Sequence, residues 1–212
     1  MKQKSYELII VGAGAAGLIA AGHAAELGLK VLVLEKMERP GRKLLITGKG
    51  RCNISNDSSM DEYFKNIFPN GKFLRTAFHN FFSSDIVELL NSHGLKTQTE
   101  RGNRIFPENN KAADVLKAIM KWLNKFSINF IYNAQVLNLL TESGKISGVE
   151  VSVNSETIKF HGKTVIIATG GKSYPATGST GDGYELAKKL GHNIIPARPS
   201  LVPLVTSGKE AS

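Results

Sequence analysis

Residues 6–35 read YELIIVGAGAAGLIAAGHAAELGLKVLVLE, and this stretch decides the fold. Its first six residues, Tyr6–Val11, form an apolar run that ends at a glycine, as a buried strand does. The alanine-rich residues 15–27 favour a helix, and Gly28 is placed to end it. A second apolar run, Lys30–Leu34, ends at Glu35. Strand, glycine turn, helix, strand and acid together predict one dinucleotide-binding βαβ unit.

The three glycines of the turn have separate physical roles. Gly12 permits a tight turn out of the first strand, Gly14 lets a pyrophosphate approach the backbone, and Gly17 lets helix and strand pack closely. The N-terminus of the helix offers N–H groups and a positive dipole end to phosphates. Glu35 can accept hydrogen bonds from both ribose hydroxyls of an adenosine and would repel a 2′-phosphate, which disfavours NADP at this site. The residues predicted here to contact the dinucleotide are Val11, Gly12, Gly14, Ala15, Ala16, Gly17, Glu35 and Lys36.

The same stretch has features of a secretion signal or a membrane span, because Lys2 and Lys4 precede an uncharged run from Leu8 to Ala25. That run contains four glycines, and its apolar residues divide into a strand-like half and a helix-like half. Its residues are small rather than strongly hydrophobic, which disfavours insertion. No membrane partner is therefore expected.

Composition and charge narrow the class of protein. The chain has 212 residues, enough for one core with an insertion, and a formal net charge of +9. This charge makes nucleic acid a partner to consider, but the basic residues are scattered, so none is expected. Cys52 is the sole cysteine, which excludes an intrachain disulfide and a zinc cluster and favours a cytoplasmic protein with no metal site.

Residues 36–56, KMERPGRKLLITGKGRCNISN, are dense in Gly, Lys, Arg and Asn and have no sustained apolar period. This composition predicts a long ordered loop, and such loops are usually functional. A Walker P-loop is excluded because six residues, instead of four, separate Gly41 from Gly48, and Gly50 occupies the Ser/Thr position. We interpret the segment as a loop that surrounds a cofactor, with the side chains of Arg42, Lys43 and Arg51 near phosphate or flavin oxygens.

The part of this segment from Gly41 to Asn56, GRKLLITGKGRCNISN, resembles the signature of a bacterial FAD-dependent flavoprotein family. That family includes bile-acid-inducible N-like and aminoacetone-oxidase-like proteins, in which the segment follows the dinucleotide motif and lines the FAD. Lys49 stands where family members often carry Gly or Asn, and Ser55 where Thr is common. The resemblance implies that the cofactor loop includes Arg42, Lys43, Gly48, Gly50, Arg51, Cys52 and Asn53.

Residues 57–127 are predicted to form a mostly helical insertion before the third strand of the sheet. Helical periods are expected at residues 72–82, 85–93 and 111–125, with Ser83, Ser84 and Asn110 as N-caps.

A hairpin is expected within the insertion, over residues 95–106, because Gly102 and Asn103 lie between short polar runs. Trp122 and the phenylalanines keep helical spacing, so they are expected in the core rather than stacked on a flavin. His79 and His93 are expected on helix surfaces.

The remaining strands follow from alternating apolar runs. Residues 128–132, INFIY, predict the third parallel strand, and KTVIIA at 163–168 predicts the next buried strand. Three alternating segments between them predict an antiparallel meander, at residues 134–140, 146–153 and 157–160.

The family resemblance extends to this second half of the chain. It places Val136 where the family uses backbone contacts to adenine, and it makes the A-T-G-G that ends the strand a second flavin-fold fingerprint. The T-G-D-G at 180–183 resembles a loop near the isoalloxazine of fumarate-reductase-like flavoproteins, and Asp182 is either close to the flavin or a helix cap. The cofactor residues implied here are Val136, Ala168, Thr169, Gly170, Gly171 and Asp182.

These observations predict an α/β, Rossmann-like, three-layer FAD-binding domain over residues 1–195, with a central parallel sheet, an antiparallel β-meander and the helical insertion. Residues 196–212 would begin a truncated substrate domain or form a tail, because the resemblance covers only the first half of such a protein. The expected function is that of an FAD-dependent oxidoreductase with a small-molecule substrate, an amine among the candidates, and NAD(P)H as a candidate electron donor.

No His/Ser/Asp arrangement and no pair of carboxylates in the sequence matches a catalytic set, so no catalytic acid or base is assigned. The rival interpretations are a tRNA-associated or other nucleic-acid-associated flavoprotein and an inactive remnant without cofactor.

Overall fold

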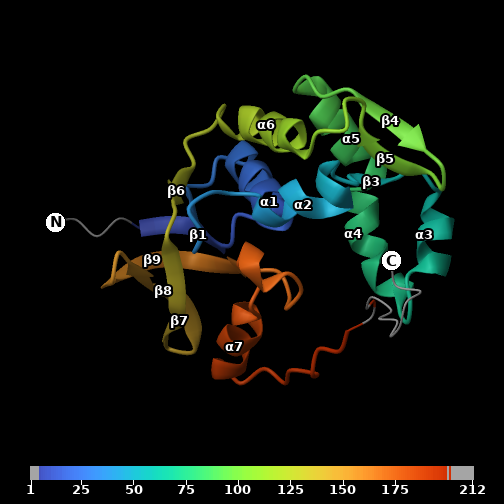
Figure 1. Ribbon diagram of the computed structural model, residues 1–212. Helices are drawn as coiled ribbons and strands as arrows, with labels where there is room; N and C mark the ends of the chain where they lie inside the picture. The colour runs from blue at the N-terminus through green and yellow to red at the C-terminus, as the bar shows by residue number, and fades with distance from the viewer. Residues whose placement is uncertain (1–4, 200, 202–212) are drawn as a thin grey trace, which may run out of the picture.

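The computed structural model describes residues 5–199 and residue 201 (Figure 1). A six-stranded sheet has the order β6-β2-β1-β9-β8-β7. The strands β1 (Ser5–Val11) and β2 (Val31–Leu34) are parallel, as are β6 (Asn129–Ile131) and β2. The meander consists of β7 (Ala134–Glu142), β8 (Lys145–Val153) and β9 (Glu156–Ile167), joined by antiparallel pairing. This mixed α/β sheet confirms the predicted fold class.

Helices cover both faces of the sheet, and the alternation along β1 and β2 explains why. Leu8 and Ile10 pack with α1 (Ala15–Glu26) and α6 (Ala112–Leu123) on one face. Ile9 and Val11 lie in the opposite cluster, which also contains residues of the meander and Leu186 of α7 (Asp182–Lys189). Both faces of these strands are therefore buried, as in other parallel sheets.

The insertion lies beside α2 (Arg42–Ile46) and α6 (Figure 1). Its small sheet has the order β3-β5-β4, and its elements are β3 (Ser55–Asn56), α3 (Met60–Asn66), the 3₁₀ turn η2 (Gly71–Leu74), α4 (Arg75–Asn80), α5 (Ser83–Ser92), β4 (Thr97–Glu100) and β5 (Arg104–Pro107). The predicted hairpin is confirmed by the antiparallel pairing of β4 with β5. Trp122 is also buried in the core, 2% exposed, as expected, but the same expectation was wrong for Phe73, which is 81% exposed.

The prediction of a long loop after Glu35 was partly wrong. The segment contains the helix α2 (Arg42–Ile46) and the 3₁₀ turn η1 (Thr47–Gly50). Gly41 adopts a left-handed backbone, with φ of 68°, and donates its N–H to the carbonyl of Ala13. This anchoring allows a helix of five residues, which is too short to show an apolar period.

Helix starts and one histidine also differ from expectation. The helix α5 begins at Ser83, and Asp85 caps it by accepting the N–H of Phe82. The helix α6 begins at Ala112 with Lys111 as its N-cap, because Asn110 has a left-handed backbone.

His93 is buried instead of lying on the surface, because its ring folds back so that Nδ1 lies 2.7 Å from the carbonyl oxygen of Leu89. The helical period predicted at 72–82 divides into η2 and α4 and ends at Asn80.

The last two predicted strands are one continuous strand, β9. Its first half pairs antiparallel with β8, and its second half, from His161 onward, pairs parallel with β1. Gly162 passes close to Ile9, where a Cβ would lie 2.7 Å from the Ile9 side chain, so a larger residue would collide there. Ile166 and Ile167 are 36% and 38% exposed, so the expectation of a buried strand at 163–168 was wrong.

The sequence interpretation divided the two strands at His161 and Gly162, and both residues lie inside β9. The η3 turn (Pro175–Thr177) and α7 follow it. The prediction that residues 196–212 begin a substrate domain or form a tail falls mostly on residues 202–212, which lie outside the described residues.

Candidate cofactor site

The turn between β1 and α1 is shaped by its three glycines. A Cβ on Gly12, whose φ is 107°, would lie 2.5 Å from the carbonyl oxygen of Ala168. A Cβ on Gly17 would lie 2.0 Å from the carbonyl oxygen of Gly12. No heavy atom lies within 4 Å of a Cβ built on Gly14. Gly12 and Gly17 are therefore required by the fold, whereas the space beside Gly14 is open to a ligand.

The N-terminus of α1 offers a binding site for an anion. Gly14 is its N-cap and has no side chain, and the first turn carries no acidic residue. The first N–H groups of a helix have no partner within the helix. Ala15 and Ala16 are exposed at this point and line the cavity, so their N–H groups are available to a phosphate.

Glu35 lies at the end of β2 and holds the glycine turn in place. Its Oε2 accepts the N–H of Ala13 at 2.7 Å, and its Oε1 accepts the N–H of Met37 at 2.9 Å. Each carboxylate oxygen can accept a second hydrogen bond. The carboxylate can therefore still accept the ribose hydroxyls for which the sequence proposed it.

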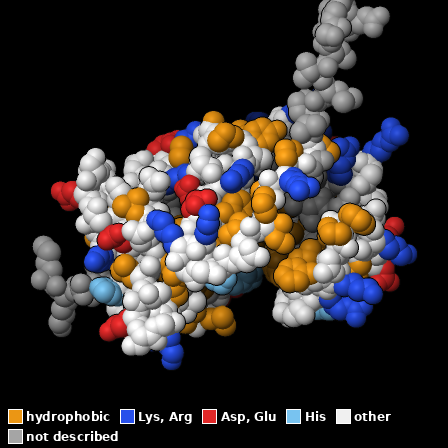
Figure 2. All heavy atoms as spheres, turned by 90° about the horizontal axis from the view of Figure 1, so that it is seen from below, with side chains coloured by type: hydrophobic (Ala, Val, Ile, Leu, Met, Phe, Trp, Pro, Cys, Tyr) orange, Lys and Arg blue, Asp and Glu red, His pale blue; other side chains and the backbone are white. Residues whose placement is uncertain are grey.

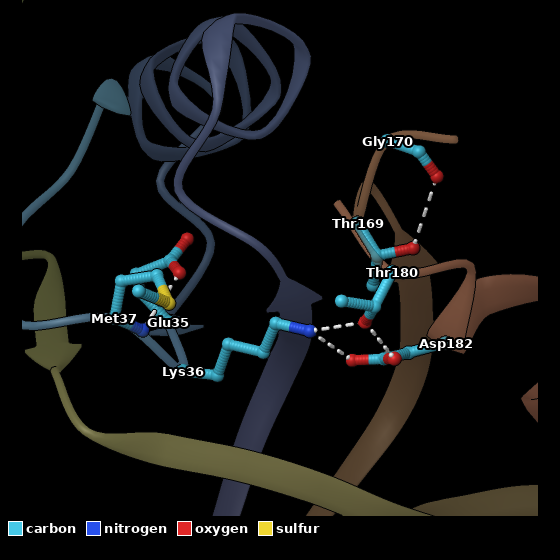
Figure 3. A network of polar contacts seen from close by, with 7 residues as sticks. All are labelled: Glu35, Lys36, Met37, Thr169, Gly170, Thr180 and Asp182. Atoms are coloured by element: carbon cyan, nitrogen blue, oxygen red, sulfur yellow. Dashed lines mark hydrogen bonds and ion pairs between the residues drawn. The ribbon is translucent and has the colours of Figure 1, made fainter. Parts of the chain in front are cut away.

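Lys36 connects the end of β2 to the start of α7 (Figure 3). Its Nζ donates to Oγ1 of Thr180 and to Oδ2 of Asp182, both at 2.6 Å. Burial acts to raise the pKa of Asp182, but the hydrogen bonds from Lys36 and Thr180 outweigh it, so the pKa lies below its ordinary value. The N-cap of α7 is Gly181, so Asp182 is the first helical residue and not the cap.

These residues surround one cavity of about 1200 Å³. The volume exceeds the 300–1,000 Å³ usual for ligand pockets, so it can hold a dinucleotide. The sequence-predicted residues that line it are Val11, Gly12, Gly14, Ala15, Ala16, Glu35, Lys36, Arg42, Lys43, Cys52, Asn53, Val136, Ala168, Thr169, Gly170 and Asp182. Their contact with a cofactor remains a prediction.

Five predicted residues do not line this cavity. They are Gly17, which packs behind the turn, and Gly48, Gly50, Arg51 and Gly171. The guanidinium of Arg51 faces the β4–β5 hairpin, where it bonds Glu100 and Asn110 and lies 4.1 Å from the ring centre of Phe106.

Cys52 is 4% exposed and packs in the core below the loop. Burial raises the pKa of its thiol above the ordinary value, and a hydrogen bond with Thr47 opposes this only in part. The thiol is therefore protonated at neutral pH, which supports a packing role.

The cavity extends along α1 beyond the phosphate position into a mostly apolar lobe. Its lining includes Ile19, Phe78, Phe81, Phe82 and Ile86. Figure 2 shows hydrophobic side chains gathered at a hollow on the underside of the molecule. Sequence reasoning missed this lobe, because its walls come from helices that are distant in the chain.

His23 lies at the edge of this lobe, with its ring between Phe81 and Trp122. The carboxylate of Glu26 is 3.0 Å from Nδ1 of His23 and accepts the indole N–H of Trp122 at 2.9 Å. This contact fixes the helix α6 against α1. Among the described residues, no group of His, Cys, Asp or Glu is arranged to hold a metal ion.

The glycine turn, the acid that ends β2 and the large cavity define a nucleotide-binding domain of the Rossmann class. Residues 6–208 match the family described as HI0933-like protein Rossmann domain, and the chain belongs to this family. The described residues contain no helix that is both long and apolar enough to cross a membrane.

Curated relatives agree with this assignment. The chain is 30% identical over 198 residues to the ribosomal RNA dihydrouridine synthase of Escherichia coli K12, covering 93% of this chain and 48% of the relative. It is 34% identical over 197 residues to the 3-dehydro-bile acid delta(4,6)-reductase of Clostridium scindens, covering 92% and 46%. The chain thus spans about half the length of the curated relatives it matches.

Solved structures share the fold. Sdh1 of Mycobacterium smegmatis superposes with a TM-score of 0.69 at 22% identity, covering 90% of this chain and 39% of that chain. A flavocytochrome c3 fumarate reductase gives a TM-score of 0.65 at 19% identity, covering 88% and 40%. The chain is an FAD-binding Rossmann domain of this family, and one of its curated relatives is a reductase by name. The open space at Gly14, the free N-terminus of α1 and the cavity volume fit that cofactor.

Proposed function

We propose that this chain is the FAD-binding part of a reductase that delivers a hydride from reduced FAD to a carbon–carbon double bond conjugated with a carbonyl group. The names of its relatives carry the proposal, because a dihydrouridine synthase, a bile acid delta(4,6)-reductase and an NADH:fumarate oxidoreductase all imply reduction of such a bond. Two electrons and a proton would reach the flavin from NAD(P)H. The hydride would then go to one carbon of the substrate and a proton to its neighbour.

This chain supplies the binding and orientation of the cofactor. Glu35 holds the adenosine end, the N-terminus of α1 holds the pyrophosphate, and the loop around α2 lines the remaining length of the cavity. The finer similarity of residues 41–56 to bile-acid-inducible N-like proteins is supported by the bile acid reductase among the relatives. We place the protein in the cytoplasm, which the lone buried cysteine supports.

We further infer that the substrate is a small molecule rather than RNA. Of the cations near the cavity, Lys36, Arg42 and Arg51 are each paired with a carboxylate of the same chain. Paired cations release few counterions when nucleic acid binds, so they contribute little affinity. Two relatives are named for ribosomal RNA, however, so the test includes RNA among the substrates.

The test begins with the absorption spectrum and the mass of any flavin released from the purified protein. The protein is then reduced anaerobically with NADH or NADPH and mixed separately with fumarate, a 3-oxo-4,6-diene steroid, an aliphatic amine and uridine-containing RNA. Reoxidation of the flavin by the steroid or by fumarate, with formation of the saturated product, is expected. Reoxidation by RNA alone, with formation of dihydrouridine, would overturn the small-molecule proposal. Protein that carries no flavin would support the inactive remnant.

A further inference from the structure

The cations that line the cofactor cavity differ in whether the protein pairs them. Lys36 is bound by Asp182 at 2.6 Å, and Arg42 by Glu38 at 2.8 Å. Arg39 also lies 3.6 Å from Glu38. Lys43 lines the same cavity and is half-buried, but no hydrogen bond or ion pair joins its ammonium group to any residue that the structure describes.

An unpaired ammonium group in a partly buried position is unfavourable. Burial lowers the pKa of Lys43 below its ordinary value, so the surroundings disfavour the charged form. A carboxylate nearby would have the opposite effect, as it does where buried charges are paired. The cavity at Lys43 therefore suits an anionic or strongly polar oxygen of a bound molecule.

The sheet order shows which end of FAD reaches this point. Glu35 ends β2, and Gly170 follows β9, with β1 and its glycine turn between them. The Nζ of Lys43 lies 3.8 Å from the position of a Cβ on Gly170. FAD that places its ribose at Glu35 and its pyrophosphate at the N-terminus of α1 therefore extends its flavin toward Lys43.

We propose that the ammonium group of Lys43 contacts the N1–C2 carbonyl edge of the isoalloxazine and pairs with the negative charge of this edge in the reduced flavin. The proposal rests on FAD being the cofactor of the proposed function, but not on the identity of the substrate. Lys43 is then a positioning residue that stabilises reduced flavin relative to oxidised flavin and raises the reduction potential. The N-terminus of α1 already offers N–H groups to the phosphates, which leaves the lysine for the ring.

The test compares the midpoint potential of bound FAD in the wild-type protein and in Lys43→Met, measured anaerobically against a reference dye. We expect Lys43→Met to hold reduced flavin about tenfold less tightly relative to oxidised flavin, since it removes a hydrogen bond made by a charged group. A tenfold change corresponds to a potential about 30 mV lower for a two-electron couple. Lys43→Arg should retain most of the wild-type potential.

Lys49→Met is the matched control, because Lys49 is an exposed lysine six residues further along that does not line the cavity. Its potential should equal that of the wild type. A Lys43→Met potential equal to that of Lys49→Met would overturn the proposal.

Binding of ADP distinguishes the flavin from the phosphates. We expect calorimetry to show the same ADP affinity for the wild type and Lys43→Met. If Lys43→Met is purified without flavin, retained ADP binding with lost FAD binding supports the proposal. Equal loss of ADP and FAD binding, in a variant with the wild-type circular dichroism spectrum, would show that Lys43 binds the phosphates instead. Failure of every substrate in the reductase assay, with the potential shift intact, would refute only the proposed function.

Discussion

Lys36 and Asp182 are 146 residues apart in the sequence, and Nζ of the lysine lies 2.6 Å from Oδ2 of the aspartate. The pair joins the end of β2 to the first turn of α7, with Thr180 bonded to both partners (Figure 3). Both residues line the cofactor cavity. The lysine therefore neutralises a carboxylate that would otherwise face the cavity without a counter-charge.

Replacing Lys36 by Met should weaken FAD binding through this carboxylate. Because the pair is partly exposed, we expect a loss of roughly 1 kcal/mol, or about fivefold in Kd. The double variant Lys36→Met/Asp182→Asn lacks both charges and should recover most of the affinity, as measured by quenching of flavin fluorescence. A double variant no better than the single one would show that Lys36 acts on the fold or on FAD directly.

Replacing Gly14 by Val should abolish FAD binding without unfolding the protein. Gly14 has an ordinary φ of −76°, and its Cβ position is open, so the new side chain would occupy the approach of the pyrophosphate. The melting temperature should remain within a few degrees of that of the flavin-free wild type. Gly17→Ala is the contrasting variant, because its Cβ would collide with the backbone of Gly12 and destabilise the fold. Wild-type flavin content in Gly14→Val would place the phosphates elsewhere.

Replacing Glu35 by Ala should weaken FAD and ADP alike, by about 1–3 kcal/mol, which is the contribution of hydrogen bonds to a charged group. The binding of FMN, which lacks adenosine, should be unchanged. The structure adds a second effect, because the buried N–H of Ala13 would lose its acceptor. Glu35→Gln keeps an acceptor oxygen and separates the two effects in a thermal melt. If FAD and FMN binding fell equally, Glu35 would act only on the turn.

Replacing Cys52 by Ser should leave the flavin content and the rate of reduction by NAD(P)H nearly unchanged. The thiol is buried and its pKa is raised, so the reactive thiolate is scarce at neutral pH and increases only as the pH rises toward the raised pKa. Alkylation by iodoacetamide should be slow at pH 7 in the folded protein and fast after denaturation. A variant that kept its flavin but lost reduction by NAD(P)H would show that the thiol takes part in the chemistry.

The part of the site that residues 6–35 form could be predicted because its contacts are local in sequence. Residues 6–35 form strand, turn, helix and strand from contacts within the segment, so spacing and glycine positions were sufficient. The same is true of the β4–β5 hairpin, whose turn residues are adjacent.

Contacts between distant segments were not accessible from the sequence. Lys36 could be placed beside a phosphate, but nothing near it in sequence indicated Asp182 as its partner. Arg51 looked like a cofactor residue because of its neighbours, whereas its partners Glu100 and Asn110 lie on the insertion. The T-G-D-G motif at 180–183 indicated that the loop before α7 returns to the cavity. It did not indicate that Asp182 pairs with Lys36.

The strand β9 pairs with β8 over one half and with β1 over the other, and its C-terminal end leads into Thr169 and Gly170 at the cavity. Its twelve residues, at about 3.3 Å each, form one continuous strand roughly 40 Å long. We therefore expect the outer meander and the cofactor site to unfold together. Occupancy of the cavity should slow hydrogen exchange at amides of β8 that touch no ligand, so the meander would report on cofactor binding from a distance.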